Sequence, residues 1–209
     1  MNLPSPLHRA TVLGLLGTLF LIGAAGCSPA ADSAPRTAVV RTSAPPSATG
    51  SAAPTPATAT DVGWVQLMAP MNQQAVKLLT LAAERAAEPR LRAFAVRLRS
   101  GHEAELDRLR PLLTRMGLPL TDVHAGHDMP GMVTERGLKA AHAAEGTAFD
   151  RLVVAQIRDH LRQSAQVSRS EITAGGRADA RELAAALVTA REASLTELER
   201  LPGAVRPLG

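Results

Sequence analysis

The sequence predicts an all-α domain over residues 60–202. Alanine, leucine, arginine and glutamate dominate this region, and no run of alternating valine, isoleucine and threonine indicates a strand. Apolar residues instead recur in steps of three and four along four long segments, which is the period of a helix with one buried face. Short turns join the segments in two pairs, and a longer connection separates the pairs. We therefore expect two helical hairpins packed as a four-helix bundle.

The first hairpin is expected to hold helices from Ala59 or Asp61 to Ala87 and from Pro89 to Met116. Pro70 predicts a kink or an N-terminal break in the first helix, whereas Pro89 occupies a favoured first-turn position of the second. Gly117 and Pro119 end the second helix. The expected apolar stripes are Val65, Met68, Ala75 or Val76, Leu79 and Ala82 or Ala83 on the first helix, and Leu91, Phe94, Leu98, His102, Glu105, Leu109, Leu112 and Met116 on the second.

The second hairpin follows a short helical stretch that begins at Thr134 and breaks near Gly146. Its long helices are expected over residues 147–174 and 178–201, separated by the glycine pair at 175–176. The expected stripes are Phe149, Leu152, Val153, Ile157, Leu161, Ala165 and Ile172 on the first of these helices, and Leu183, Leu187, Ala190, Leu195, Leu198 and Leu201 on the second.

The N-terminus has the pattern of a bacterial lipoprotein leader. Arg9 supplies a positive charge, a short apolar run follows, and Ala-Ala-Gly-Cys ends at Cys27. Small residues before the cysteine suit a signal peptidase, although Ala24 stands where leucine is usual. We expect a signal peptide over residues 1–26 and a lipid on Cys27, which would anchor the exported protein to the cell membrane on its extracytoplasmic side. A plain cleaved signal and an uncleaved anchor are the alternatives.

Residues 27–59 are rich in serine, alanine, proline and threonine, a composition that buries too little apolar surface to fold. We expect a disordered linker there, a domain over residues 60–202 and a tail over residues 203–209.

The connection between the hairpins has the sequence HAGHDMPGM. Imidazole and thioether groups are soft ligands, which bind copper better than they bind hard metal ions. The loop is therefore a candidate site for Cu(I), and the alternative is a solvated connection whose methionines cap the end of the bundle. The four candidate ligands are His124, His127, Met129 and Met132.

A second candidate site lies on helix faces expected to point inward. Its residues are Met68, Met71, His102 and His160. The alternative is a buried polar network in which His102 and Glu105 bond Asn72 and Gln156. His142 is expected on the surface.

Several short motifs occur along the domain, in its two halves and in the loop between them. MAPMNQQA at 68–75, HEAEL at 102–106, MPGM at 129–132, GTAFD at 146–150, His160-Leu161 and REASL at 191–195 follow one another at matching places. In this pattern the chain resembles a divergent member of the domain of unknown function 305 family (DUF305), ferritin-like helical bundles of bacterial envelopes. Met71 and Asn72 stand where that family carries a His-His pair, and only His160 remains of the second pair. Some members bind copper in the periplasm, so the resemblance implies copper as the metal.

Other functional classes find little support. A di-iron enzyme needs Glu-x-x-His pairs, and no glutamate in the chain has a histidine three residues on. The formal net charge is +4, but arginines alternate with acidic residues along the helices, which indicates an ion-paired surface rather than a phosphate-binding stripe. We expect no enzyme and no nucleic-acid partner. The rival to metal binding is a structural or protein-interaction module at the cell envelope.

Overall fold

A computed structural model describes residues 56–124 and 127–202. Within these ranges the chain forms five helices and no strand, as expected for an all-α domain. The helices are α1 (Ala59–Arg85), α2 (Pro89–Arg115), α3 (Glu135–Ala143), α4 (Gly146–Ala174) and α5 (Ala178–Glu199). The expected signal peptide, the lipidation site Cys27, most of the linker and the tail lie outside the described residues.

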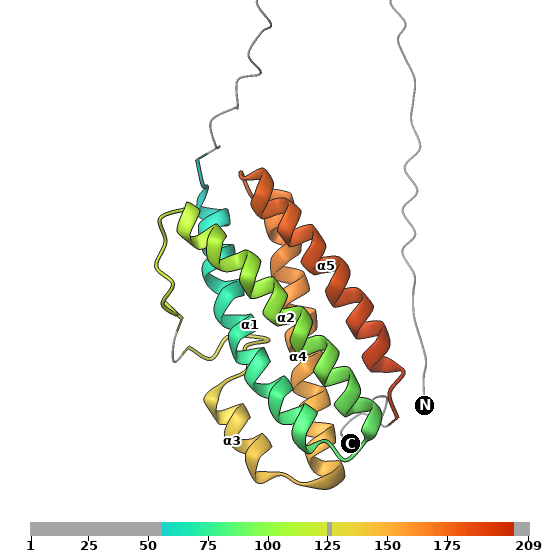
Figure 1. The fold of residues 1–209 in the computed structure, drawn as a ribbon. Helices are drawn as coiled ribbons and strands as arrows, with labels where there is room; N and C mark the ends of the chain where they lie inside the picture. Colours follow the sequence, from blue (N-terminus) through green and yellow to red (C-terminus); the bar gives the residue numbers. More distant parts are fainter. Residues whose placement is uncertain (1–55, 125–126, 203–209) are drawn as a thin grey trace, which may run out of the picture. The chain divides into compact units, whose positions relative to one another are not determined.

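The helices pack as two hairpins. α1 pairs with α2 and α4 pairs with α5, while α1 also packs on α4 and α2 on α5 (Figure 1). The short α3 contacts α1 and α4. The connection from α2 to α3 runs beside the long helices, so the two hairpins meet directly (Figure 1).

The boundaries of α1 follow from its capping residues. Thr58 is the N-cap, and its hydroxyl accepts a hydrogen bond from the backbone N–H of Asp61, whose carboxylate accepts in turn from the Thr58 backbone. The expected break at Pro70 is wrong, because α1 continues through this residue as one helix. Pro70 and its neighbours Ala69 and Met71 are all buried, so packing compensates for the backbone hydrogen bond that proline cannot donate. Pro89 starts α2 as expected.

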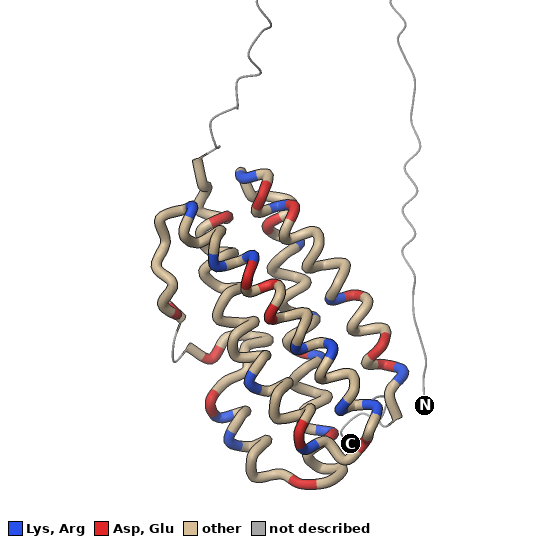
Figure 2. The backbone as a smooth tube through the Cα atoms, viewed as in Figure 1, with Lys and Arg blue, Asp and Glu red and all other residues tan. Residues whose placement is uncertain are grey.

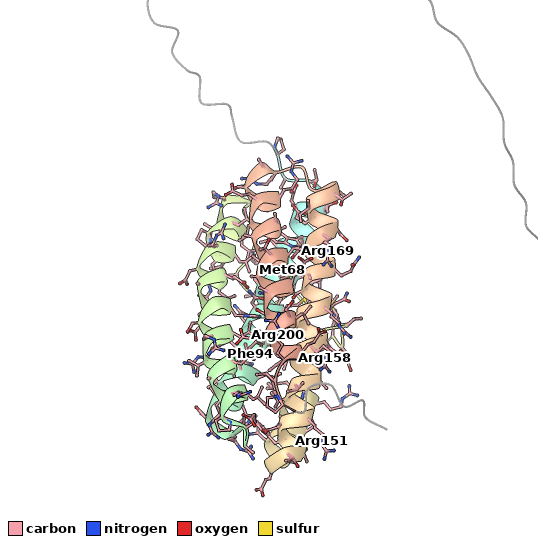
Figure 3. The ribbon with its side chains drawn as sticks, turned by 90° about the vertical axis from the view of Figure 1, so that its right-hand side faces the viewer. Met68, Phe94, Arg151, Arg158, Arg169 and Arg200 are labelled. Atoms are coloured by element: carbon pink, nitrogen blue, oxygen red, sulfur yellow. The ribbon has the colours of Figure 1, made fainter. Side chains whose placement is uncertain are left out.

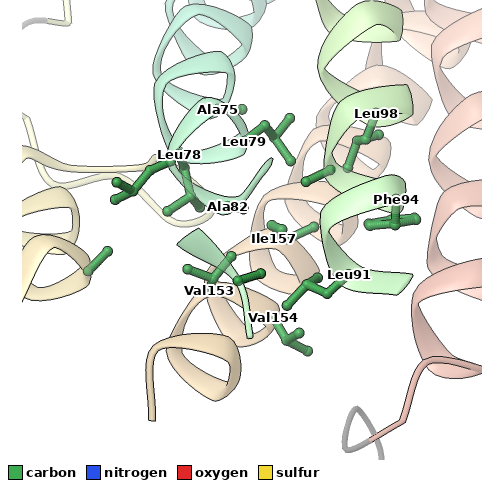
Figure 4. Close-up of a cluster of buried hydrophobic side chains, with 14 of the residues drawn as sticks. Ala75, Leu78, Leu79, Ala82, Leu91, Phe94, Leu98, Val153, Val154 and Ile157 are labelled. Carbon is green, nitrogen blue, oxygen red and sulfur yellow. The ribbon is translucent and has the colours of Figure 1, made fainter. Parts of the chain in front are cut away.

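Buried apolar side chains form two clusters along the helices. Ala75, Leu79, Phe94, Leu98, Val153 and Ile157 belong to the first cluster (Figure 4), whereas Trp64, Met68, Met71, Leu109 and Leu183 belong to the second. On α1, α2 and α5, buried polar residues lie between the members of the two clusters. We call this set, with its α4 members, the polar layer: Asn72, His102, Glu105, His160, Ser164 and Arg191.

In the second hairpin, two residues of the expected apolar stripes are exposed, and the residue next to each of them is buried instead. Ile172 is 38% exposed while Glu171 is fully buried. Ala190 is likewise exposed while Arg191 is 1% exposed. In both cases hydrophobicity alone selected the neighbouring apolar residue, whereas the buried residue is ionisable and meets a group on another helix, Glu105 for Arg191 and Asp61 for Glu171.

Basic and acidic residues are interspersed along the helices (Figure 2). Arg151, Arg158 and Arg169 follow one another along α4 (Figure 3). Surface ion pairs join helices, as between Arg169 of α4 and Glu192 of α5 at 2.7 Å. His142 is exposed, as expected. Within the described ranges, no helix has the length and apolar content needed to cross a membrane.

Candidate functional site

The polar layer is organised around the guanidinium group of Arg191. Its two terminal nitrogens donate hydrogen bonds to the two carboxylate oxygens of Glu105, at 2.8 and 2.6 Å. The Glu105 side chain is 13% exposed and the Arg191 side chain 1%. This two-pronged geometry is the strongest form of an arginine–carboxylate pair.

Two neutral side chains complete the contacts of this ion pair. Arg191 also donates to the Asn72 amide oxygen at 3.0 Å and, through Nε, to the Ser164 hydroxyl at 2.9 Å. The Asn72 amide nitrogen donates to Glu105 at 2.7 Å. The expected bond between Asn72 and Glu105 is therefore present, whereas Gln156 bonds the carbonyl of Gly137 instead. All four long helices contribute to this network.

His102 and His160 meet beside the ion pair. Their Nε2 atoms are 2.8 Å apart and their ring centroids 5.0 Å apart. On the far side of each ring, Nδ1 faces a backbone carbonyl: Leu98 at 2.9 Å from His102, and Gly131 at 3.2 Å from His160. Each of these three contacts requires one proton, and two neutral rings carry only two.

The surroundings disfavour a third proton. Burial lowers the pKa of His102 well below its usual value, and the positive charge of Arg191 lowers it further. Burial lowers the pKa of His160 in the same way, with added repulsion from His102 and Arg191. The pair is therefore neutral near pH 7. A metal cation between the rings would meet the same positive charge of Arg191.

The carbonyl that faces His160 belongs to the loop. Gly131 has a φ of 70°, and a Cβ atom at this position would overlap the Cβ of Gln163 and lie 3.0 Å from the carbonyl oxygen of Asp159. Only glycine lets the backbone lie this close to α4. The loop is thereby joined to the polar layer through the ring of His160.

The loop histidines line a cavity of about 350 Å³ at the domain surface. The ring centroids of His124 and His127 are 6.2 Å apart. Asp122, Asp128, Glu135, Arg136 and Met132 line the same cavity, so two imidazoles, three carboxylates, one guanidinium and one thioether border one space. Met129 lines a neighbouring hollow with Pro130 and Asp159.

The structure thus brings together part of each predicted donor set. Three of the four loop donors border one cavity, and the two interior histidines meet, but Met68 accepts a hydrogen bond from Ser168 and packs with Met71 in the second cluster. Among residues 56–124 and 127–202, no group of three or more histidine, cysteine, aspartate and glutamate side chains is arranged to hold a metal ion. Arg191, the centre of the polar layer, was not predicted as a site residue.

Comparison with known proteins identifies the family. The profile of DUF305, described as a domain of unknown function, matches residues 61–202. The chain belongs to the DUF305 family. Two crystal structures share its fold at 19% sequence identity. The DUF305 protein of Streptomyces coelicolor gives a TM-score of 0.59 over 66% of this chain and 89% of the other. The DUF305 fragment of Deinococcus radiodurans gives 0.61 over 69% and 96%. No curated protein matches the chain.

Proposed function

We propose that this DUF305 protein is an exported, lipid-anchored protein that binds a soft metal ion, copper as Cu(I), through the loop between its hairpins. The observation that supports this most directly is the shared cavity of His124, His127 and Met132. Imidazole and thioether groups are neutral donors that suit Cu(I). The role is binding rather than catalysis.

The polar layer is the weaker candidate for a metal. A metal-binding histidine commonly donates its second ring N–H to a backbone carbonyl, and both His102 and His160 have such a carbonyl. However, Arg191 already provides a buried cation there, and its charge is balanced by Glu105. A further cation would add an unbalanced charge to a buried site, which is costly.

Export rests on the sequence of residues 1–27 and on a relative. The Streptomyces coelicolor protein is described as a predicted secreted protein. A lipid on Cys27 would hold the folded domain at the membrane surface by means of the linker. The packing of the two hairpins supports a four-helix bundle of the ferritin-like kind.

The second candidate function is a structural or protein-interaction module without metal. It is favoured by the polar layer, in which Asn72, Glu105, Ser164 and Arg191 bond one another with no ligand required. The two candidates differ in one measurable property, affinity for Cu(I).

The test is a titration of the chain lacking residues 1–55 with Cu(I) in the presence of a competing chelator. We expect binding by the wild type. Replacing Met129 and Met132 together by alanine should weaken binding by at least about tenfold, a loss of about 1.4 kcal/mol. Helicity measured by circular dichroism should stay the same, because the loop lies outside the four long helices.

The matched control is His142→Ala, which removes an exposed histidine of α3 and should leave the affinity unchanged. Affinity that survives the loop variant but is lost in His102→Ala would transfer the site to the polar layer. An absence of Cu(I) binding by the wild type would favour the structural module.

A further inference from the structure

Two buried carboxyl groups meet at the end of the domain where α1 begins. Asp61 lies in the first turn of α1 and Glu171 in the last turn of α4, and both residues have no exposed surface. The Glu171 side chain interacts with that of Asp61, so two acidic groups from different helices share one site.

Asp61 is held as a carboxylate by several donors. Oδ2 accepts from the hydroxyl and the backbone N–H of Thr58, each at 2.6 Å, and from the Gly176 N–H at 3.2 Å. Oδ1 accepts from the Arg177 N–H at 2.9 Å. Although burial acts to raise it, these hydrogen bonds lower the pKa of Asp61 below its usual value. Asp61 thereby ties the turn between α4 and α5 to the N-cap of α1.

Glu171 has no comparable donors. Both of its carboxyl oxygens are buried and accept no hydrogen bond from a described N–H or O–H group. The carboxyl lies against the Cα of Gly175, where a Cβ would overlap it. Glu171 also lies at the C-terminal end of α4, where the helix dipole disfavours a negative charge.

Cations of the neighbouring elements lie around the two carboxyl groups, and two of them donate hydrogen bonds to a third carboxylate. The Arg177 guanidinium, in the turn, donates to Asp179 of α5, and Arg115 of α2 donates to the same carboxylate. Arg181 of α5 attracts Glu171 from an exposed position. Two ionised carboxylates would therefore repel each other in a buried place, which a proton on one of them prevents.

We propose that Glu171 is a carboxylic acid that donates its proton to the Asp61 carboxylate, and that this shared proton is a pH-sensitive latch between the end of α4 and the start of α1. When the proton leaves for solvent, Glu171 becomes a second anion beside Asp61 and the latch weakens. The latch lies where the predicted linker joins the domain, so the pH outside the membrane controls how firmly the first turn of α1 is held.

The direction of the effect follows from Glu171. Burial, together with the adjacent Asp61, raises the pKa of Glu171 to about 7 from an ordinary 4.5. The folded protein therefore binds this proton more tightly than the unfolded chain does. The stabilisation is fully present below about pH 4.5 and is lost as the pH rises through about 7.

The test compares full-length wild type with Glu171→Gln. Glutamine keeps a donor toward Asp61 but cannot lose a proton near pH 7. Between about pH 5 and pH 8.5, the thermal midpoint of the wild type should fall by about 5 °C more than that of the variant. Comparing the two proteins removes the shared contribution of His102, His160 and the surface groups. Glu182→Gln, an exposed change on α5, should behave as the wild type does.

Infrared spectroscopy gives a second readout that needs no comparison of stabilities. The wild type at about pH 6 should show the carbonyl absorption of a protonated carboxyl group, which disappears as the pH rises through about 7. The absorption should be absent from Glu171→Gln. An equal fall in thermal midpoint for both proteins, or no protonated carboxyl in the wild type at about pH 6, would overturn the latch.

Discussion

The polar layer and the loop carry similar donor groups in opposite settings. In the polar layer, His102 and His160 are buried and face each other. They adjoin the ion pair of Glu105 and Arg191, whose hydrogen-bond network includes residues from all four long helices. In the loop, His127 is exposed and His124 half-buried beside an open cavity. The first set is enclosed by protein groups beside the buried cation of Arg191, whereas the second borders an open cavity.

This difference shows why the proposed cation site lies in the loop rather than in the polar layer. A buried site that acquires an arginine gains a permanent cation and loses affinity for other cations. The loop histidines can be replaced at little cost to the core, because neither His124 nor His127 is buried. The two regions are connected through the carbonyl of Gly131, which faces the ring of His160 at 3.2 Å.

The largest expected effect comes from breaking the ion pair of the polar layer. Glu105→Ala leaves the Arg191 guanidinium buried without its carboxylate and should lower the free energy of unfolding by about 3 kcal/mol. Urea denaturation followed by circular dichroism measures this. The matched control is Glu192→Ala, which removes the partner of Arg169 in a surface pair with side chains 46% and 58% exposed, and should cost less than about 1 kcal/mol. Equal losses in the two variants would show that the buried pair is no more important than the surface one.

An intermediate effect is expected where the loop meets the polar layer. Gly131→Ala places a Cβ against Gln163 at a positive φ and should lower the free energy of unfolding by about 2 kcal/mol. Gly146→Ala is the control, since Gly146 also has a positive φ (54°) but no atom lies within 4 Å of its Cβ position. It should cost about 1 kcal/mol. A Gly131 variant as stable as the Gly146 variant would mean that the loop can detach from α4 freely.

The smallest effect is expected in the loop itself. His124→Ala and His127→Ala should each change the free energy of unfolding by no more than about 0.5 kcal/mol, because neither side chain is buried. The measurement is the same urea titration without metal. A loss of 2 kcal/mol or more, on the order of the Gly131 variant, would place the loop histidines among the structural residues and remove the contrast between the two regions.

Periodicity predicted most of the helical architecture. The long helices have bounds within two residues of those expected, because their apolar stripes end at proline or glycine, as at Pro89 and Gly175. Of the two outcomes expected at Pro70, the break is absent, since the sequence does not reveal how well neighbouring helices pack around a proline.

The buried charges were harder to predict. Arg191 and Glu171 each adjoin an apolar residue, Ala190 and Ile172, that fits a stripe equally well, and only the partner on another helix decides between them. One indication was present for Arg191, which lies four residues from both Leu187 and Leu195 on the same helix face. For Glu171 the deciding neighbour is Asp61, more than a hundred residues away.

Trp64 gives the domain a built-in optical reporter. It is the only tryptophan of a chain that has no tyrosine, it is buried, and its indole N–H donates to the Ser168 hydroxyl at 3.2 Å. Trp64 lies three residues from Asp61 on α1, and Ser168 lies three residues from Glu171 on α4. Tryptophan fluorescence of the unlabelled protein therefore reports on one end of the domain, and its wavelength and intensity follow water entry beside the first turn of α1.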